Sequence, residues 1–137
     1  MTTIIDAEGA SLGRLSTHVA KRLLEGEEIA IVNSEKAIIS GKKTAIKNKY
    51  KQKREVGTYR KGPFFPRLPH QIVKRTIRGM IPYQKSHGRE AFKKLKCYVE
   101  VPDEFKDKKI EKIEGVEKNP VDFMTVKELS KSLGEEN

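Results

Sequence analysis

The clearest hydrophobic pattern in the chain lies in residues 11–26. Apolar residues recur there at helical spacing and give a helix one apolar face. These residues are Leu12, Leu15, Val19 and Leu23. Ser11 can cap the N-terminus of this helix, and Gly26 stands where a left-handed residue commonly ends one. The pattern therefore predicts an amphipathic helix between these two residues.

Short apolar runs on both sides of this helix predict strands. Residues 3–5 form the first run and lead into a turn at residues 6–9. Residues 29–32 form the second, which is typical of a strand covered on both faces. A strand, a helix and a strand in this order indicate a crossover between parallel strands, so we expect an α/β layer fold. The run Cys97–Val101, followed by Pro102, predicts a further strand.

Residues 42–54 predict a second helix, in which cations dominate. Its candidates for a buried stripe are Ala45, Ile46 and Tyr50, and cations occupy most of the remaining circumference. Such a surface repels itself unless an anion lies nearby.

The density of Gly and Pro from residue 57 to residue 70 predicts a loop. Aromatic residues and cations interleave in it. Either this loop forms an extended arm with stacking faces, or Phe64 and Phe65 pack into the core beneath it.

Residues 72–96 predict two helices, each with an apolar face and cations elsewhere. The first has Val73, Ile77, Met80 and Ile81 on its apolar face, and Gly79 and Pro82 end it. The second has Ala91, Phe92 and Leu95 on its apolar face, with Arg89, Lys93 and Lys96 in a row beside it.

After Pro102 the sequence mixes charges of both signs, which predicts an extension over residues 103–137 beyond a main domain of residues 1–102. Thr125 and Glu128 match a capping box at the start of a closing helix. Leu129 and Leu133 are expected to face inward, and Gly134 to end the helix.

Charge is segregated along the chain. The 137 residues carry a formal net charge of +10, but residues 36–96 hold 19 of the 29 Lys and Arg residues against only Glu55 and Glu90, an excess of 17. A merely solvated surface would mix the signs throughout. This segment therefore predicts a polyanionic partner, and the few interleaved aromatics favour folded RNA recognised by its shape and phosphates.

Other chemistry has weak support. Cys97 is the only cysteine, which excludes an intrachain disulfide and a cysteine zinc site and fits a reducing compartment. The histidines are scattered: His18, which we expect near the packed face of the first helix, His70 and His87. Gly9 and Gly13 fail the spacing of a phosphate-binding loop, so a tight turn close to a helix or to RNA explains them better. We expect no metal, no cofactor, no small-molecule substrate and no enzymatic activity.

No basic leader and no long apolar run occurs, so we expect a soluble, cytoplasmic protein without a membrane partner.

Four collinear blocks between Ile4 and Pro102 resemble the universal large-subunit ribosomal protein thirteen family. They are IIDAEGASLGRLSTHVAKRLLEG, IVNSEKAIISGKK, IRGMIP and GREAFKKLKCYVEVP. The proline-rich GPFFPRLP is most similar to the archaeal and eukaryotic branch, and the short tail favours the archaeal one.

The resemblance implies a three-layer α/β/α domain with a small, mainly parallel sheet, basic loop and helix extensions and a C-terminal helical tail. It implies a structural constituent of the large ribosomal subunit, which binds large-subunit rRNA, supports assembly and contacts neighbouring ribosomal proteins. Together with the charge pattern it predicts an RNA-binding set. That set is Arg14, Lys42, Lys43, Lys47, Lys49, Lys51, Lys53, Arg54, Arg60, Lys61, Arg67, Lys74, Arg75, Arg78, Lys85, Arg89, Lys93, Lys94 and Lys96.

Two alternatives stay open at this point. The free protein could act as a translational regulator that binds a messenger RNA, or the chain could be a small α/β enzyme that holds a phosphorylated ligand at the Gly9–Arg14 turn.

Overall fold

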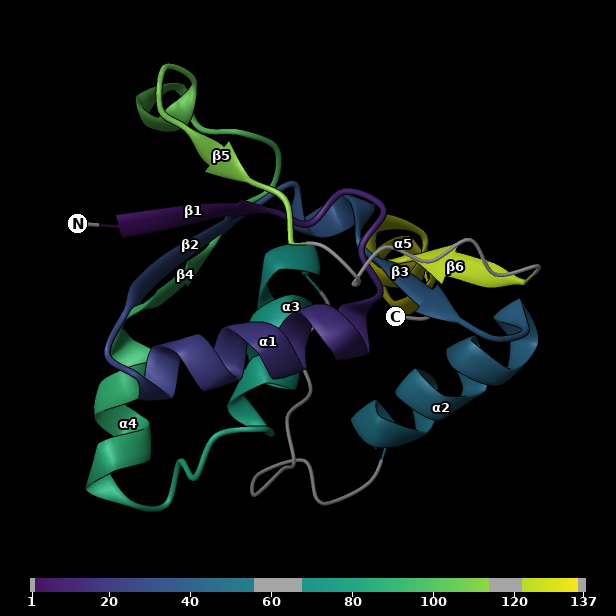
Figure 1. The fold of residues 1–137 in the computed structure, drawn as a ribbon. Coiled ribbons are helices and arrows are strands. Elements are labelled where there is room, and N and C mark those ends of the chain that lie inside the picture. Colours follow the sequence, from purple (N-terminus) through teal and green to yellow (C-terminus); the bar gives the residue numbers. More distant parts are fainter. Residues whose placement is uncertain (1, 56–67, 114–121, 136–137) are drawn as a thin grey trace.

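The computed structural model describes residues 2–55, 68–113 and 122–135, with only the backbone at residues 53–55 and 134–135 (Figure 1). Along the chain the elements are β1 (Thr2–Asp6), α1 (Leu12–Leu24), β2 (Glu28–Val32), the 3-10 helix η1 (Ser34–Lys36), β3 (Ile38–Ser40), α2 (Lys43–Glu55), α3 (Pro69–Arg78), α4 (Ser86–Lys93), β4 (Leu95–Cys97), the 3-10 helix η2 (Asp103–Phe105), β5 (Ile110–Glu111), β6 (Phe123–Thr125) and α5 (Val126–Glu135).

The main sheet has the strand order β4-β2-β1-β5, and all of its pairs are parallel. The central pair aligns Ile4 with Ala30 and Ile5 with Ile31. Parallel neighbours require a crossover connection, and α1 supplies the one between β1 and β2. The predicted α/β fold with a small, mainly parallel sheet is therefore confirmed.

Helices cover one face of this sheet. The helices α1, α3 and α4 lie together below the strands in Figure 1. Ile5, Ile29 and Ile31 point from the sheet into one hydrophobic cluster with the apolar face of α1. Within that face Leu15 and Val19 are fully buried, as the helical spacing predicted.

The opposite face has a thinner cover. Ile4, Ala30 and Val32 form a second, smaller cluster with Phe105 of η2. The rings of Phe105 and Tyr98 meet edge to face, with their centroids 5.4 Å apart. The third layer is thus one turn of 3-10 helix and its flanking chain.

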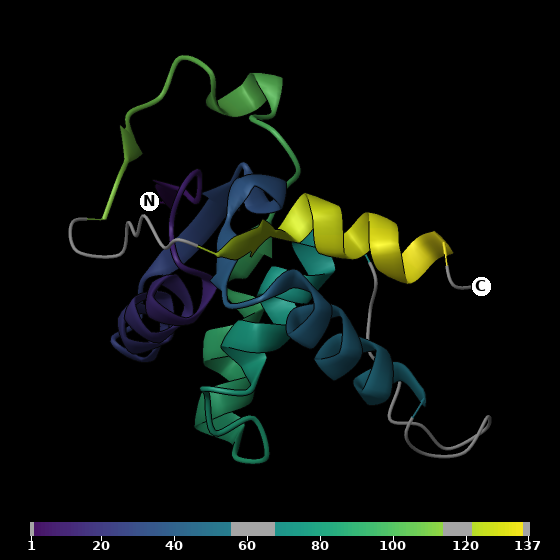
Figure 2. The same ribbon diagram turned by 90° about the vertical axis from the view of Figure 1, so that its right-hand side faces the viewer.

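A second sheet joins the C-terminal segment to the middle of the chain. Strand β6 pairs antiparallel with β3, and α5 then packs beside α2 and α3 (Figure 2). Leu129 and Leu133 are buried in the main hydrophobic cluster, as predicted. The Glu128 backbone N–H donates to the Thr125 hydroxyl at 3.2 Å, which confirms the predicted cap, although α5 continues through Gly134. The division into a main domain of residues 1–102 and an extension over residues 103–137 stays a prediction.

The start of α3 differs from the prediction. The helix begins at Pro69, inside the segment expected to be a loop. Proline is tolerated at the first helical position, because the N–H that it lacks would have no partner in the helix. Ile72 adds a fully buried residue that the predicted apolar face omitted, whereas Met80 lies beyond the end of α3 at Arg78 and is 42% exposed.

The boundary between α4 and β4 also differs. The helix ends at Lys93, and Leu95 and Lys96 belong to the strand, which is over at Cys97. The expected row of Arg89, Lys93 and Lys96 on one helix is therefore wrong. Leu95 lies four residues after Ala91, so it satisfies helical spacing, but it is buried by pairing beside Ile29 of β2.

Candidate nucleic-acid interface

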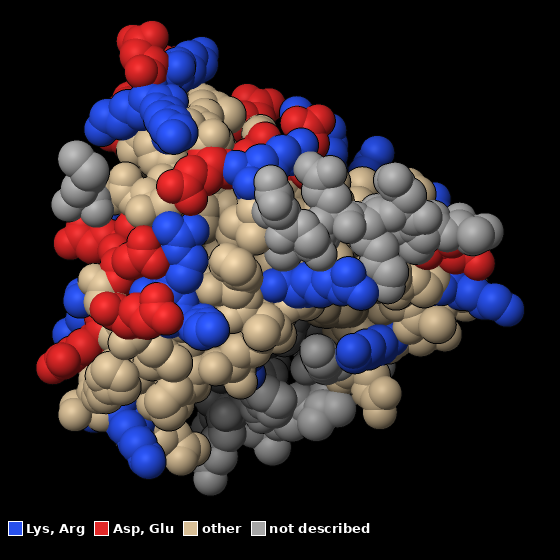
Figure 3. Space-filling view, in the orientation of Figure 1, with Lys and Arg blue, Asp and Glu red and all other residues tan. Residues whose placement is uncertain are grey.

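The surface repeats the segregation of charge seen in the sequence. In the orientation of Figure 3, acidic side chains gather on the left and upper parts, while the lower right shows Lys and Arg with few acids. This lower right part contains α2 in the matching view of Figure 1.

The helix α2 presents its cations because little of it is buried. Ile46 and Tyr50 face the core, one turn apart, whereas Ala45 is exposed, so its predicted place in the buried stripe is wrong. Burial raises the pKa of the Tyr50 hydroxyl. The exposed predicted cations here are Lys42, just before the helix, and Lys43, Lys47, Lys49 and Lys51. The backbone of Lys53 and Arg54 continues the same helix.

Lys43 has an acidic neighbour. Its ammonium lies 3.2 Å from the carboxylate of Glu128, and both side chains are about half exposed. An ion pair this exposed contributes little to stability, because water and salt screen it. The pair therefore leaves Lys43 available to another anion.

A second group of cations runs from the last turn of α3 to β4 in the sequence. Arg75, Lys85, Arg89, Lys93, Lys94 and Lys96 are all exposed. Arg89 donates to the backbone carbonyl of Gln84 at 3.2 Å, and Lys94 donates to that of Gly26 at 3.4 Å. In Figure 1, α4 lies on the other side of α1 and α3 from α2.

Lys74 and Arg78 differ from the other predicted cations because they are half-buried. The Lys74 ammonium lies 5.2 Å from the centroid of the Phe92 ring. The Arg78 guanidinium lies 4.1 Å from the centroid of the Tyr83 ring. Helical spacing predicted a packing role for Phe92 and none for Tyr83, although both lie among cations in the chain.

The first turn of α1 adds one more exposed cation, Arg14, just after the turn that follows β1. Gly9 has a φ of +73°, which disfavours other residues, and its N–H donates to the Lys36 carbonyl at 3.1 Å. A Cβ added to Gly9 or Gly13 would meet nothing within 4 Å. The turn is therefore tight and its backbone is bonded to η1, but the space on the Cβ side of both glycines is open in the described chain.

Three of the predicted cations, Arg60, Lys61 and Arg67, lie outside the described residues, as do Phe64 and Phe65. Conversely, Lys36 is exposed at the end of η1 and was missing from the predicted set. It belongs to the same basic segment, so its charge alone could have included it.

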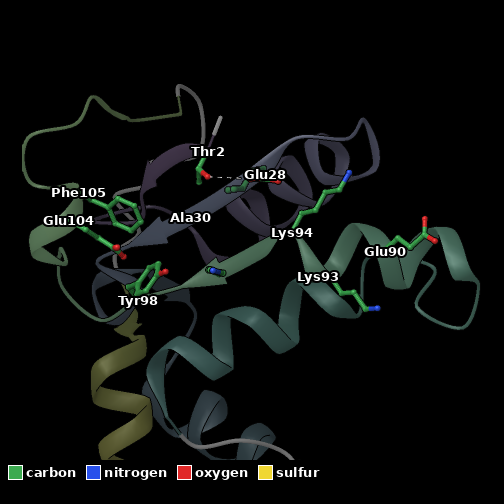
Figure 4. Close-up of a pocket in the computed structure, with 11 residues that line it drawn as sticks. Thr2, Glu28, Ala30, Glu90, Lys93, Lys94, Tyr98, Glu104 and Phe105 are labelled. Atoms are coloured by element: carbon green, nitrogen blue, oxygen red, sulfur yellow. Dashed lines mark hydrogen bonds between the residues drawn. The ribbon is translucent and has the colours of Figure 1, made fainter.

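A shallow groove of about 680 Å³ opens beside β4, over the thinly covered face of the sheet (Figure 4). Lys93, Lys94 and Lys96 line it, but so do Glu28, Glu90 and Glu104. The matched charges make this groove a poor phosphate site compared with the surface of α2.

The structure adds little in favour of other chemistry. No group of His, Cys, Asp and Glu that could hold a metal ion occurs among the residues described. His18 is exposed, so its expected place near the packed face of α1 is wrong. Cys97 lies in β4 and is half-buried, and burial raises the pKa of its thiol to about 12, which disfavours the nucleophilic thiolate. Within the described part of the chain, no helix has both the length and the apolarity to cross a membrane.

The sequence of the chain is similar to those of known proteins. A family model described as ribosomal protein L13 matches residues 1–104. The large ribosomal subunit protein uL13 of Archaeoglobus fulgidus is 46% identical, and the match covers 96% of this chain and 87% of that protein. Those of Methanosphaera stadtmanae and Methanocaldococcus jannaschii are 48% and 50% identical, with at least 96% of each chain covered.

Proposed function

The chain belongs to the ribosomal protein L13 family, and from this premise we infer that it is a structural constituent of the large ribosomal subunit. It binds large-subunit rRNA through its exposed cations, supports subunit assembly and contacts neighbouring ribosomal proteins. Its location is the ribosome, in the cytoplasm. It acts without a cofactor and without catalysis.

The observation that carries rRNA binding is the exposure of the cations in the basic segment. Thirteen predicted cations outside the undescribed stretches have described side chains in residues 36–96, and only Lys74 and Arg78 of these are half-buried. Exposed cations on several elements can neutralise phosphates and release their counterions. The proposed contacts are Arg14, Lys42, Lys43, Lys47, Lys49, Lys51, Lys53, Arg54, Arg60, Lys61, Arg67, Arg75, Lys85, Arg89, Lys93, Lys94 and Lys96.

The placement of the aromatic residues favours recognition of RNA by backbone and shape. Among the described aromatic side chains only Phe123 is exposed, at 41%, while Tyr50 and Phe105 are buried and the others are half-buried. Proteins that read single-stranded bases present several rings on which bases stack. Contacts to phosphates and 2′-hydroxyls of folded rRNA fit this surface better.

Salt-dependent binding tests the α2 contacts. The probe is in vitro transcribed large-subunit rRNA of the source organism, titrated over a series of KCl concentrations. The variant Lys47→Gln/Lys49→Gln should lower the slope of log affinity against log salt by about 1.4–1.8, because each phosphate contact accounts for roughly 0.7–0.9.

The matched control is Lys127→Gln/Lys131→Gln, which removes two exposed cations of α5 outside the basic segment. Equal slopes for the two double variants would contradict a specific role for α2. Sedimentation of cell extract through a sucrose gradient tests the ribosomal location itself. At low salt the protein should move with the large subunit, and a free protein at the top of the gradient would overturn the assignment.

A further inference from the structure

Four side chains form a continuous stack between α3 and α4. Lys74 lies over Phe92, the Phe92 and Tyr83 rings meet at 90° with centroids 5.5 Å apart, and Arg78 lies over Tyr83. We call this set, Lys74, Phe92, Tyr83 and Arg78, the cation–aromatic stack. Lys74 and Arg78 are one helical turn apart on α3, Tyr83 lies in the following turn and Phe92 in α4. The stack therefore joins three successive segments.

The two cations of the stack, Lys74 and Arg78, contact aromatic rings and are partly shielded from solvent. All four members of the stack are half-buried, whereas the neighbouring Arg75, Arg89 and Lys93 are exposed. In the part of the chain that the structure describes, neither Lys74 nor Arg78 has a carboxylate partner. The negatively polarised faces of the Phe92 and Tyr83 rings interact with these two cations instead of a carboxylate. The Arg78 guanidinium, 4.1 Å from the centroid of the Tyr83 ring, is well inside the range of a cation–π interaction.

The position of α4, the helix that carries Phe92, depends on contacts with the rest of the protein. With only eight residues, α4 is too short to be stable alone, so its position depends on tertiary contacts. One of these is the close approach of Gly88 to the Pro82 backbone, where an added Cβ would overlap the carbonyl group. The stack is another, and it acts at the other end of α4, through Phe92. Arg89 and Lys93 project from the helix between or next to these two supports.

We propose that Lys74 and Arg78 are positioning residues, which fix α4 and its cations for RNA through the cation–aromatic stack instead of contacting phosphate themselves. This inference rests on the proposed function. The exposed cations of α4 and β4 make the phosphate contacts, and the stack sets where those contacts lie relative to α1 and α3.

The experiment compares five variants of the full chain by thermal unfolding and by titration with the rRNA transcript over a series of KCl concentrations. Arg78→Gln removes the cation of the stack, and Tyr83→Leu removes its ring without changing the charge. The double variant carries both changes. Lys93→Gln is the matched control, because it removes an exposed cation of α4 that lies outside the stack.

Arg78→Gln and Tyr83→Leu should each lower Tm and weaken RNA binding by roughly two- to fivefold, with the salt slope of the wild type. The double variant should be no weaker than Tyr83→Leu alone, since loss of the Tyr83 ring already removes the contact that Arg78 makes with it. Lys93→Gln should leave Tm unchanged and lower the salt slope by roughly 0.7–0.9, the value for one lost phosphate contact. Arg78→Lys keeps a cation over the ring and should recover part of both losses.

Two results would overturn the proposal. One is an Arg78→Gln variant with unchanged Tm and a salt slope lowered as much as in Lys93→Gln, since that is the signature of a direct phosphate contact. The other is additive loss in the double variant, which would show that Arg78 does not act through Tyr83. If the wild type fails to bind the transcript, the proposed function fails, while the coupling of Arg78 and Tyr83 in Tm is still measured.

Discussion

The helices α1 and α2 have the same length, 13 residues, but opposite relations to the core. Six residues of α1 are buried, whereas the described side chains of α2 bury only Ile46 and Tyr50. Lys43, Lys47 and Lys51 also follow one another at four-residue spacing on α2, where like charges repel. The core of the protein itself therefore holds α1, while α2 retains a surface that an anionic partner would stabilise.

The largest expected effect comes from truncating each helix at its buried face. Leu15→Ala should lower the free energy of unfolding by about 2–5 kcal/mol, because Leu15 is fully buried between α1 and the sheet. Ile46→Ala should cost about 2 kcal/mol or less, because Ile46 lies at the margin of the core and is 6% exposed. Chemical denaturation of both variants checks this difference. Equal costs would mean that α2 is as firmly packed as α1.

Gly13 of the packed helix α1 and Gly88 of the basic helix α4 allow a matched comparison of Gly→Ala substitutions. Gly88→Ala in α4 should cost about 1–3 kcal/mol, because the new methyl group would overlap the rigid backbone of Pro82. Gly13→Ala in α1 should be neutral or stabilise by about 0.4–1 kcal/mol, since open space surrounds the position and the unfolded chain loses freedom. Thermal unfolding measures both changes. A harmless Gly88→Ala would remove one of the two supports assigned to α4.

The sequence predicted the packed part of the molecule better than the basic part. Leu12, Leu15, Val19 and Leu23 define α1 because one period places all of them on one face. Residues 38–40 and 123–125 pair as strands across some 85 positions, and no local pattern encodes such a partner. The exposure of Ala45 likewise depends on which part of the protein packs against α2. The few apolar residues of α2 do not determine this from the sequence.

The candidate interface was predictable in charge but not in arrangement. Net charge identified the basic segment, and most of its described cations are exposed. The roles of Lys74 and Arg78 depend on rings that lie eighteen and five residues away in the sequence, and only the turn after α3 brings these rings to them. The prediction that Leu95 lies on the apolar face of a helix was wrong for the same reason. Its four-residue spacing from Ala91 fits a helix, but Leu95 is buried because it pairs with Ile29 of β2.

The N-terminal caps of α1 and α5 extend the comparison of α1 with α2 to smaller effects, because α5 packs beside α2. Thr125→Ala should cost about 1 kcal/mol, since it removes the hydroxyl that accepts from the Glu128 N–H. Ser11→Ala, at the start of α1, should cost a few tenths of a kcal/mol or less, because the Ser11 hydroxyl makes no capping bond. Denaturant midpoints of the two variants provide the measurement, and a larger loss for Ser11→Ala would contradict this difference.

The smallest effect concerns the exposed end of α1, where Arg22 pairs with Glu27 at 2.7 Å and with Glu111 at 3.3 Å. The hydrogen bond from Arg22 holds the pKa of Glu27 below its ordinary value of 4.5. A carboxylate with a lowered folded pKa adds stability above its ordinary pKa, and this contribution is lost as the pH falls through the folded value.

Arg22→Gln should therefore cost less than about 1 kcal/mol at pH 7, since these side chains are partly exposed and screened. The difference from the wild type should shrink as the pH falls below 4.5, whereas Lys21→Gln, an exposed neighbour on α1, should show no such dependence. Denaturation of the three proteins between pH 3 and pH 7 checks the sign. A difference that stays the same from pH 7 to pH 3 would mean that Arg22 stabilises α1 by packing and not by charge, which would extend the core-held character of α1 to its exposed end.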